Sequence, residues 1–255
     1  MRWRFLVTPA DDGPSNMALD EALTRRAAVT GDATFRIYGW SRPTLSIGRN
    51  QRARGCYDED EARRLGVEFV RRPTGGRALL HDHEITYSVT LPMRDGRTPR
   101  AAYHFINCVL LAGLERLGVQ ARKAVGSVSL SPGLRPCFDV PSEHEIEVDG
   151  RKLVGSAQWR HAGVLLQHGS ILVRDDQAII ARLVKQPLVS MTRAATLVDA
   201  LGWEPTVADV APAMLASLGA EVGSPVESFE LDAAPSTDAA ALRDVYADES
   251  WTWRR

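Results

Sequence analysis

The chain has 255 residues, of which 25% are charged, and a formal net charge of −1. This length can bury a substantial core, and the even charge balance gives no sign of a nucleic-acid or membrane-surface partner. No apolar stretch approaches the roughly 20 residues of a membrane span, so we expect a cytoplasmic protein. The odd number of cysteines, Cys56, Cys108 and Cys137, argues against a disulfide framework and predicts free thiols.

The first part of the chain is expected to mix helices and strands. A helix over residues 16–29 follows Pro14 and Ser15, which can start it by fixing the chain and capping its first amides. Strands are predicted at FRIYGW (35–40), PTLSIG (43–48) and GVEFVRR (66–72), with a helix at EDEARRL (59–65). In EITYSVTL (84–91) apolar and polar residues alternate, which indicates a strand with one apolar and one polar face.

The rest of the chain begins with a buried helix over 103–118, in which Cys108 is a packing residue. The segment GSVSLSPGLRP (126–136) is expected to be a mobile loop that leads to Cys137. HEIEV and RKLVGSAQW flank Asp149–Gly150 and predict a hairpin, followed by a strand at GVLLQHGSILV. Residues 176–255 are expected to be helical around the short extended piece VESFEL, so the chain is interpreted as a single α+β domain over 1–255.

Lys152 is one of only three lysines among 31 basic residues. A lysine can provide a compact charge, lose a proton in a low-dielectric pocket, or carry a covalent bond, none of which arginine does as readily. In the predicted hairpin register, however, Lys152 faces Glu147, so a cross-strand ion pair on a solvated face, worth at most about 1 kcal/mol, is the structural alternative. Cys137, at the end of the predicted loop, is placed as a nucleophile would be, and a nearby Lys152 would favour its thiolate. A buried structural cysteine is the alternative.

A second candidate site is VRRPTGGRALLHDHE, where Gly75 and Gly76 interrupt the chain beside three arginines. Adjacent glycines let backbone amides approach a ligand closely, so the segment is typical of an anion or acyl-carbonyl cradle. An ordinary turn is the alternative, and the pattern is neither a Walker loop nor a dinucleotide fingerprint. His81 follows the glycines, and no pair of histidines has zinc-ligand spacing, so no metal site is expected.

Taken together, these stretches resemble the biotin/lipoate A/B protein ligase family. The resemblance is strongest over residues 30–180, and its motifs stand in the family's order: PTLSIGRNQ, RRPTGGRALLHDHEITYSV, CFDVPSEHE, GRKLVGSAQ and GVLLQHGSIL. It implies an α+β fold like the catalytic domain of class II aminoacyl-tRNA synthetases and biotin ligases, a mixed sheet with flanking helices. Residues 181–255, including YADESWTWRR, would form a mainly helical C-terminal part of the same domain.

Within this family, lipoate ligases activate free lipoate with ATP, whereas octanoyltransferases take a ready-made thioester from acyl carrier protein. The ligases usually have a third glycine where this chain has Arg77, and cysteine-dependent octanoyltransferases have a cysteine ahead of the motif lysine, as Cys137 precedes Lys152. The resemblance therefore favours an octanoyltransferase that loads octanoyl onto the glycine cleavage H protein or another lipoyl domain, without a cofactor. It implies catalytic roles for Cys137 and Lys152 and a substrate-binding set: Arg72, Gly75, Gly76, Arg77, His81, Gly155, Ser156 and Ala157.

Other functions remain open from the sequence. Arg71, Arg72 and Arg77 are candidates for contacts with acidic carrier proteins, although Arg71 and Arg72 alternate in a strand and cannot both face the site. The enzyme alternatives are the catalytic domain of an ATP-dependent lipoate–protein ligase and an octanoyl amidotransferase between lipoyl carriers. A carrier-binding or acyl-binding module without turnover is the alternative outside enzymes.

Overall fold

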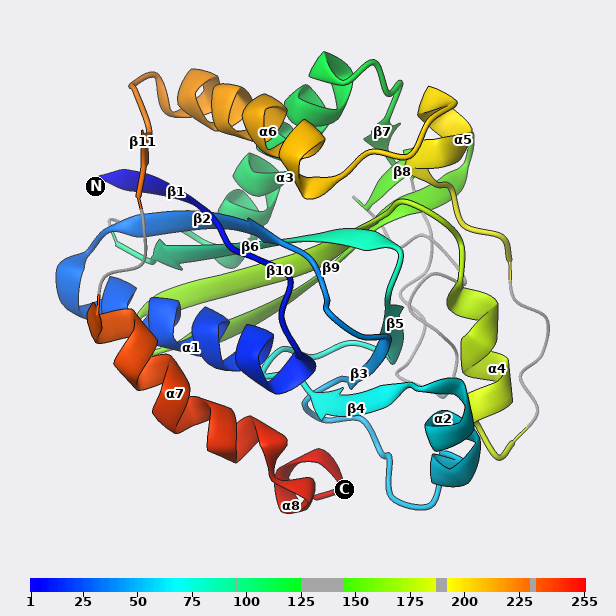
Figure 1. Cartoon of the computed structure of the whole chain (residues 1–255). Helices are drawn as coiled ribbons and strands as arrows, with labels where there is room; N and C mark the ends of the chain where they lie inside the picture. The colour runs from blue at the N-terminus through cyan, green and yellow to red at the C-terminus, as the bar shows by residue number, and fades with distance from the viewer. Residues whose placement is uncertain (95, 125–144, 187–191, 230–232) are drawn as a thin grey trace.

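The computed structural model describes residues 1–94, 96–124, 145–186, 192–229 and 233–255 (Figure 1). In this part of the chain the strands form two mixed sheets, with the strand orders β11-β1-β2-β6-β10-β9-β8-β7 and β4-β3-β5. The strands are β1 (Trp3–Val7), β2 (Ala33–Tyr38), β3 (Thr44–Ile47), β4 (Glu68–Arg71), β5 (Leu79–His81), β6 (Glu84–Pro92), β7 (Arg122–Lys123), β8 (Ile146–Val148), β9 (Arg151–His161), β10 (Val164–Leu172) and β11 (Glu227–Ser228).

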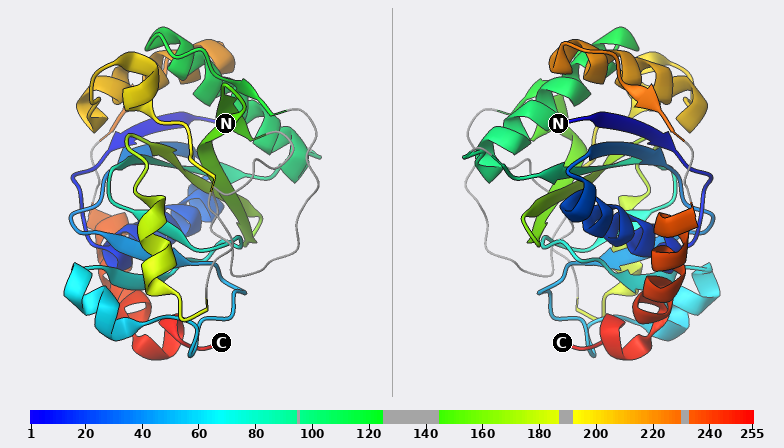
Figure 2. Two further views of the ribbon diagram at one scale, coloured as in Figure 1. Left: turned by 90° about the vertical axis from the view of Figure 1, so that its right-hand side faces the viewer. Right: turned by 90° about the vertical axis from the view of Figure 1, so that its left-hand side faces the viewer.

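Helices lie on both faces of the large sheet. One face is covered by α1 (Gly13–Thr30), against which α7 (Ala233–Ala247) packs, and the other by α3 (Pro99–Arg116) and α6 (Val207–Val222) (Figures 1 and 2). The shorter helices are α2 (Glu59–Leu65), η1 (Gln177–Ile179), α4 (Ile180–Leu183), α5 (Leu197–Leu201) and α8 (Glu249–Thr252). Across the described residues, no helix combines the length and the apolar character needed to cross a membrane.

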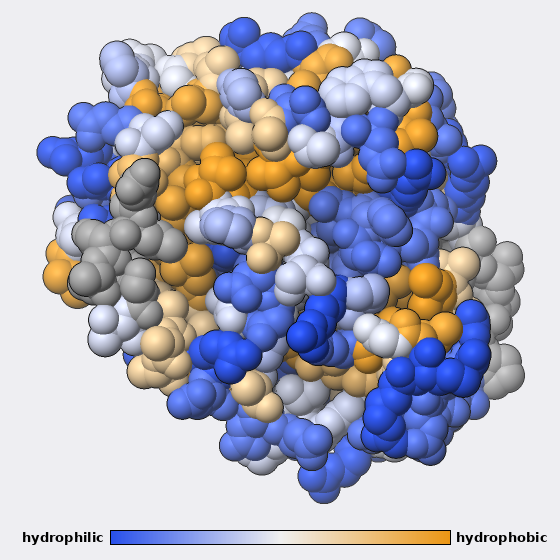
Figure 3. Space-filling view, viewed as in Figure 1, coloured by the Kyte–Doolittle hydropathy of each residue, from blue (hydrophilic) through white to orange (hydrophobic). Residues whose placement is uncertain are grey.

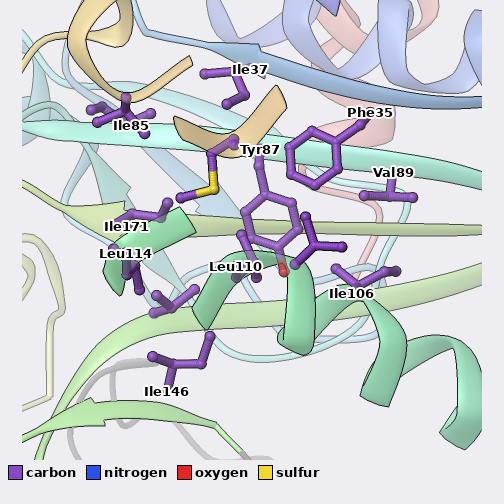
Figure 4. Packing of buried hydrophobic residues seen from close by; sticks show 14 of the residues in the cluster. Phe35, Ile37, Ile85, Tyr87, Val89, Ile106, Leu110, Leu114, Ile146 and Ile171 are labelled. Atoms are coloured by element: carbon purple, nitrogen blue, oxygen red, sulfur yellow. The ribbon is translucent and has the colours of Figure 1, made fainter. Parts of the chain in front are cut away.

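The main apolar core lies between the large sheet and α3. Figure 4 shows side chains from β2 and β6 meeting side chains from α3, among them Phe35, Tyr87, Ile106 and Leu110. Burial of such side chains is the main favourable term for folding, about 1.5–3 kcal/mol for each large apolar residue. On the outer surface, a band of apolar residues crosses the face that carries β1, below α6, while the lower part of this face is mostly hydrophilic (Figure 3). The predicted buried helix over 103–118 thus corresponds to α3, and its apolar side chains form the core together with one face of the sheet.

The other face of the large sheet carries a polar interior. The predicted alternation in β6 is present, but all nine of its residues are buried, including the polar ones. The Ser88 hydroxyl donates to Asp20 of α1 at 2.7 Å, and Arg36 of β2 forms an ion pair with the same carboxylate at 2.8 Å. The side chains of Arg36 and Asp20 are 1% and 0% exposed. α1 thus covers the polar face of β6, where the Asp20 carboxylate accepts from both Ser88 and Arg36, while Thr90 Oγ1 and Glu84 Oε2 are buried without a hydrogen-bond partner among the described residues.

The start of α1 differs in detail from the prediction. The N-cap is Asp12, whose carboxylate accepts a hydrogen bond from the Ser15 backbone N–H at 2.8 Å. Pro14 occupies the first turn, where its missing N–H costs nothing. Ser15 therefore lies inside the helix, and the cap comes from a carboxylate that also forms an ion pair with Arg243 of α7.

The hairpin at Asp149–Gly150 is confirmed. Asp149 and Gly150 have φ angles of 50° and 74°, the left-handed values that a two-residue turn requires. The register sets Glu147 opposite Lys152, as predicted, with a register shift between Ile146 and Glu147. β10 continues the same antiparallel sheet and pairs with both β9 and β6.

The remaining predicted elements are confirmed, with shifted ends. The predicted strands 35–40, 43–48 and 66–72 correspond to β2, β3 and β4, and the helices 59–65 and 103–118 correspond to α2 and α3. The described residues of 176–255 are mainly helical, and the described part of the extended piece contains β11, which pairs with β1 in parallel. The predicted loop over 126–136 lies outside the described residues.

Replacing Arg36 by methionine should lower the free energy of unfolding by about 3–5 kcal/mol, because the Asp20 carboxylate would remain buried without its charge partner. Arg25→Met is the matched control, since Arg25 forms an ion pair with Glu21 at the surface of α1, the helix that also carries Asp20. It should cost less than about 1 kcal/mol. Urea unfolding of the three proteins measures both values, and equal losses would contradict a special role for the buried pair.

Candidate active site

A pocket lies where α1, the large sheet and the loop between β4 and β5 meet. Apolar and aromatic side chains from α1, β2 and β5 form one part of its wall, and backbone from β9 and β10 forms another. The lining residues are Met17, Tyr38, Trp40, Arg72, Gly76, Leu79, His81, Thr86, Gly155, Ser156, Ala157, His168, Gly169 and Ser170. The pocket thus offers an apolar channel with a few polar groups, as small-molecule sites commonly do.

Most of the predicted substrate-binding residues line this pocket. The structure brings together Arg72, Gly76, His81, Gly155, Ser156 and Ala157. Gly75 and Arg77 lie beside it in the same loop, where their carbonyl oxygens accept hydrogen bonds from Arg72. Two distant segments of the sequence, one in the glycine loop and one on β9, therefore face the same space.

Arg72 organises the loop of residues 72–77, which we call the glycine loop. Its guanidinium donates to the carbonyls of Gly75 at 2.8 Å and Arg77 at 2.7 Å, and to Ser46 on β3. Because the peptide bond is planar and trans, the N–H of Gly76 points away from the Gly75 carbonyl and hence away from Arg72. Gly76 has a φ of 92°, and a Cβ added to Gly48 would lie 2.0 Å from the Gly76 carbonyl oxygen. The close approach of these two backbones fixes the shape of the loop.

The arginines Arg71 and Arg72 point in opposite directions, as their alternation predicted. Arg71 is fully buried and donates to the carbonyls of Gly48, Gln51 and Thr252. Burial, followed by the charges of nearby arginines, lowers the pKa of Arg71 to about 10. Since both guanidinium groups are committed to backbone carbonyls inside the protein, the suggestion that Arg71 and Arg72 contact carrier proteins is wrong.

His168 joins the glycine loop to the buried ion pair beneath α1. Its Nδ1 lies 3.3 Å from Asp20, and its Nε2 lies 2.6 Å from the Thr74 hydroxyl. Burial lowers the pKa of His168, and the interaction with Asp20 opposes this shift only in part. For Asp20, burial would raise the pKa, but the His168 hydrogen bond and the Arg36 charge outweigh it and lower the pKa. The neutral ring therefore donates to Asp20 and accepts from Thr74.

This network was not predicted from the sequence. No motif in the sequence contains Asp20 or Arg36, and the spacing of His168 from the other histidines does not indicate a metal site. The one signal in the sequence was the presence of Asn16, Asp20 and Thr24 at helical spacing, which places polar groups on the face that α1 buries.

His81 lies in the pocket wall among polar groups. Its Nδ1 donates to Glu84 at 2.7 Å, and its Nε2 lies 2.7 Å from the Ser46 hydroxyl, which also accepts from Arg72. The Trp40 ring stacks on the imidazole with a centroid distance of 4.0 Å. These contacts hold the ring in one orientation and link it to the glycine loop.

Lys152 is 2% exposed, and its Nζ donates to Glu145 at 2.7 Å. The interpretation as a solvated pair with Glu147 is therefore wrong, because Glu147 binds Arg122 at 2.9 Å instead. Its strand, β9, continues within three residues to Gly155 in the pocket wall. The charge of a buried ammonium group such as that of Lys152 acts strongly on neighbouring groups, because little water screens it.

Several predicted features can be placed only in part. Cys137, the predicted nucleophile, lies outside the described residues. Cys56 and Cys108 are free thiols, as expected, and Cys108 is half-buried on α3. Within the described ranges, no group of three or more His, Cys, Asp and Glu side chains could hold a metal ion.

Comparison with known proteins gives a consistent result. The family described as the lipoyl protein ligase A/B catalytic domain matches residues 12–219. The octanoyltransferase LipM of Kyrpidia tusciae is 38% identical over 272 residues, covering 99% of this chain and 99% of its own length. LipM of Carboxydothermus hydrogenoformans is 43% identical over 187 residues, covering 72% and 69%.

Solved structures share the fold. The putative lipoate protein ligase Ta0514 from T. acidophilum has a TM-score of 0.82 at 22% identity and covers 100% of both chains. Lipoate-protein ligase A bound with ATP has a TM-score of 0.83 at 23% identity, covering 99% of both. The predicted α+β class, a mixed sheet with flanking helices, is thereby confirmed.

His168 should make stability depend on pH. Its pKa is lowered in the folded protein, so unfolding takes up a proton as the pH falls below about 6.5, the ordinary value for histidine. As the pH falls from 6.5 to 5, the free energy of unfolding should therefore decrease through this residue. In His168→Gln this pH-dependent loss should disappear, whereas the exposed control His83→Gln should retain it. Urea unfolding at pH 6.5 and at pH 5 measures the free energy of unfolding of each protein. The same change between the two pH values in all three proteins would refute the assignment.

Proposed function

The chain belongs to the lipoyl protein ligase A/B catalytic domain family and is an octanoyltransferase of lipoate biosynthesis, and we propose that it works through a thioester on Cys137. The donor is octanoyl-acyl carrier protein, and the acceptor is a lysine of the glycine cleavage H protein or another lipoyl domain. The reaction takes place in the cytoplasm, and residues 1–255 act as one catalytic domain. The packing of α7 on α1 supports this last point.

In the first step the Cys137 thiolate attacks the carbonyl carbon of the octanoyl thioester. The bond from that carbon to the carrier sulfur breaks, and the carrier leaves as a thiol after taking up a proton. In this proposal the N–H of Gly76, which points away from Arg72, donates to the oxyanion that forms in this step. Arg77, beside it, occupies the position where family ligases have a third glycine.

In the second step the neutral amine of the acceptor lysine attacks the octanoyl-enzyme. The new C–N bond gives an amide, the Cys137 sulfur leaves as a thiolate, and the amine loses its proton to solvent or to a nearby base. Written in this way, the transfer balances without ATP or a metal ion. The apolar wall of the pocket, including Met17, Trp40 and Leu79, receives the acyl chain, at about 0.8 kcal/mol for each buried methylene.

The observation that carries the proposal is the burial of Lys152 on the strand that lines the pocket. A lysine on a solvated face would have little influence on a thiol, whereas a buried ammonium can stabilise a thiolate within several ångströms. Its ion pair with Glu145 holds the ammonium in a defined position. Glu145 also weakens the field of Lys152, so the balance between the two charges sets the reactivity of the thiol.

Incubation of the protein with octanoyl-acyl carrier protein, without ATP or acceptor, should add one octanoyl group that hydroxylamine removes. Cys137→Ser should remain unmodified, as read by intact mass. Cys108→Ser is the matched control, because the Cys108 thiol lies 3.6 Å from the Lys123 amine. An adduct lost in Cys108→Ser and kept in Cys137→Ser would overturn the assignment, and ATP-dependent use of free lipoate would identify a ligase.

The alkylation rate of Cys137 should depend on Lys152. In a Cys56→Ser/Cys108→Ser background, Lys152→Ala should shift the midpoint of the plot of alkylation rate against pH to a pH about one unit or more higher. Loss of the positive charge disfavours the thiolate. Lys185→Ala, at an exposed lysine, is the control and should leave the profile unchanged.

The double variant Lys152→Met/Glu145→Gln separates the two charges. The double variant should also shift the midpoint to higher pH, but by less than Lys152→Ala does. In Lys152→Ala the negative charge of Glu145 remains and disfavours the thiolate further, whereas the double variant removes both charges. Identical profiles in the parent and Lys152→Ala would show that the amine and the thiol do not interact.

A further inference from the structure

Arginines from two distant segments meet beside the candidate active site. The loop after β3 supplies Arg49, Arg52 and Arg54, and the residues after α8 supply Arg254 and Arg255. The backbone N–H groups of Ala53 and Arg54 donate to the Arg255 carbonyl at 2.9 and 2.7 Å, and Arg254 donates to the Arg49 carbonyl at 2.8 Å. Figure 2 shows the C-terminal residues lying beside this loop. We call these five residues the arginine surface.

The charges of the arginine surface are not balanced within the described part of the chain. None of the five arginines forms an ion pair there, whereas exposed arginines elsewhere do, such as Arg174 with Glu204 and Arg182 with Glu61. Burial, followed by the charges of Arg49 and Arg255, lowers the pKa of Arg254. Like charges held together in this way raise the free energy of the unbound protein, and an anionic partner would relieve the repulsion.

The arginine surface borders the pocket. The backbone N–H of Arg49 donates to the Thr74 carbonyl in the glycine loop at 2.8 Å. Its guanidinium lies over the Trp159 ring, 5.5 Å from the centroid, and Trp159 is two residues from Ala157 in the pocket wall. A protein that delivers a group into the pocket would therefore reach these charges.

We propose that the arginine surface docks the acidic face of the carrier protein that donates the acyl group. This inference rests on the proposed function. The octanoyl chain has no charge, so the arginines have nothing to recognise in the transferred group itself and act on the protein that carries it. The acceptor presents a lysine, whose ammonium form the arginines repel, which favours the donor as the partner. Docking of this kind speeds the encounter and weakens with salt.

The test compares two donors in the acylation half-reaction, measured by intact mass without acceptor. In Arg52→Gln/Arg54→Gln the rate constant kcat/KM for octanoyl-acyl carrier protein should fall roughly tenfold at low salt, and the difference should shrink at high salt. Acylation by octanoyl-pantetheine, which lacks the carrier protein, should keep the parent rate. Arg97→Gln/Arg100→Gln is the control, because these exposed arginines lie beyond Pro92, at the opposite end of β6 from the residue Thr86 that lines the pocket.

Three results would overturn the docking proposal: an unchanged rate with the carrier donor, an equal loss with octanoyl-pantetheine, or the same loss in Arg97→Gln/Arg100→Gln. The acceptor half-reaction is followed separately, after loading the enzyme with octanoyl-pantetheine. A loss confined to that half-reaction would assign the surface to the acceptor and refute its assignment to the donor. If neither donor acylates the parent protein, the proposed function itself fails.

Discussion

The buried ion pair between Asp20 and Arg36 is the interaction on which the rest of the site depends. It lies between α1 and β2, and through His168 it reaches Thr74 in the glycine loop. Removing charges from water is costly, and it is tolerated only where each group finds several partners. Arg36 meets this condition with hydrogen bonds to Thr8, Asn16 and Asp20. The helix, the sheet and the loop are therefore positioned by one polar network, and the pocket is the space that they enclose.

Much of the fold could be predicted from the sequence because its signals are local. The alternation in β6, the Asp149–Gly150 turn and the helical spacing of α3 each depend on neighbouring residues. The polar network could not be predicted in the same way. Asp20 and His168 are 148 residues apart, and a polar stripe on a helix normally faces solvent. Only the folded arrangement shows that α1 turns this stripe toward the equally polar face of β6.

The candidate site shows the same division between local and long-range information. The motifs in the glycine loop and on β9 identified residues that line one pocket, because the family resemblance gives their roles without the geometry. The charge partner of Lys152 was assigned to Glu147 from the hairpin register, and that register is correct. The irregularity between Ile146 and Glu147 lets Glu145 reach the amine instead. A β-bulge re-aims side chains in this way, and simple strand alternation does not reveal it.

The pocket wall also contains Gly169, at a point where β9 and β10 run side by side. A Cβ at Gly169 would lie 2.3 Å from the Gly155 carbonyl and 2.8 Å from the Tyr87 ring. A side chain at this position would collide with β9 and with Tyr87 of β6, so the packing of the three strands excludes any residue larger than glycine here. In the proposed reaction, a change in acyl-chain length is accommodated by side chains on other elements, such as Met17 of α1 and Leu79 of β5. Under that proposal, selectivity for chain length can evolve on the side of the pocket formed by α1 and β5, while the sheet on the other side stays unchanged.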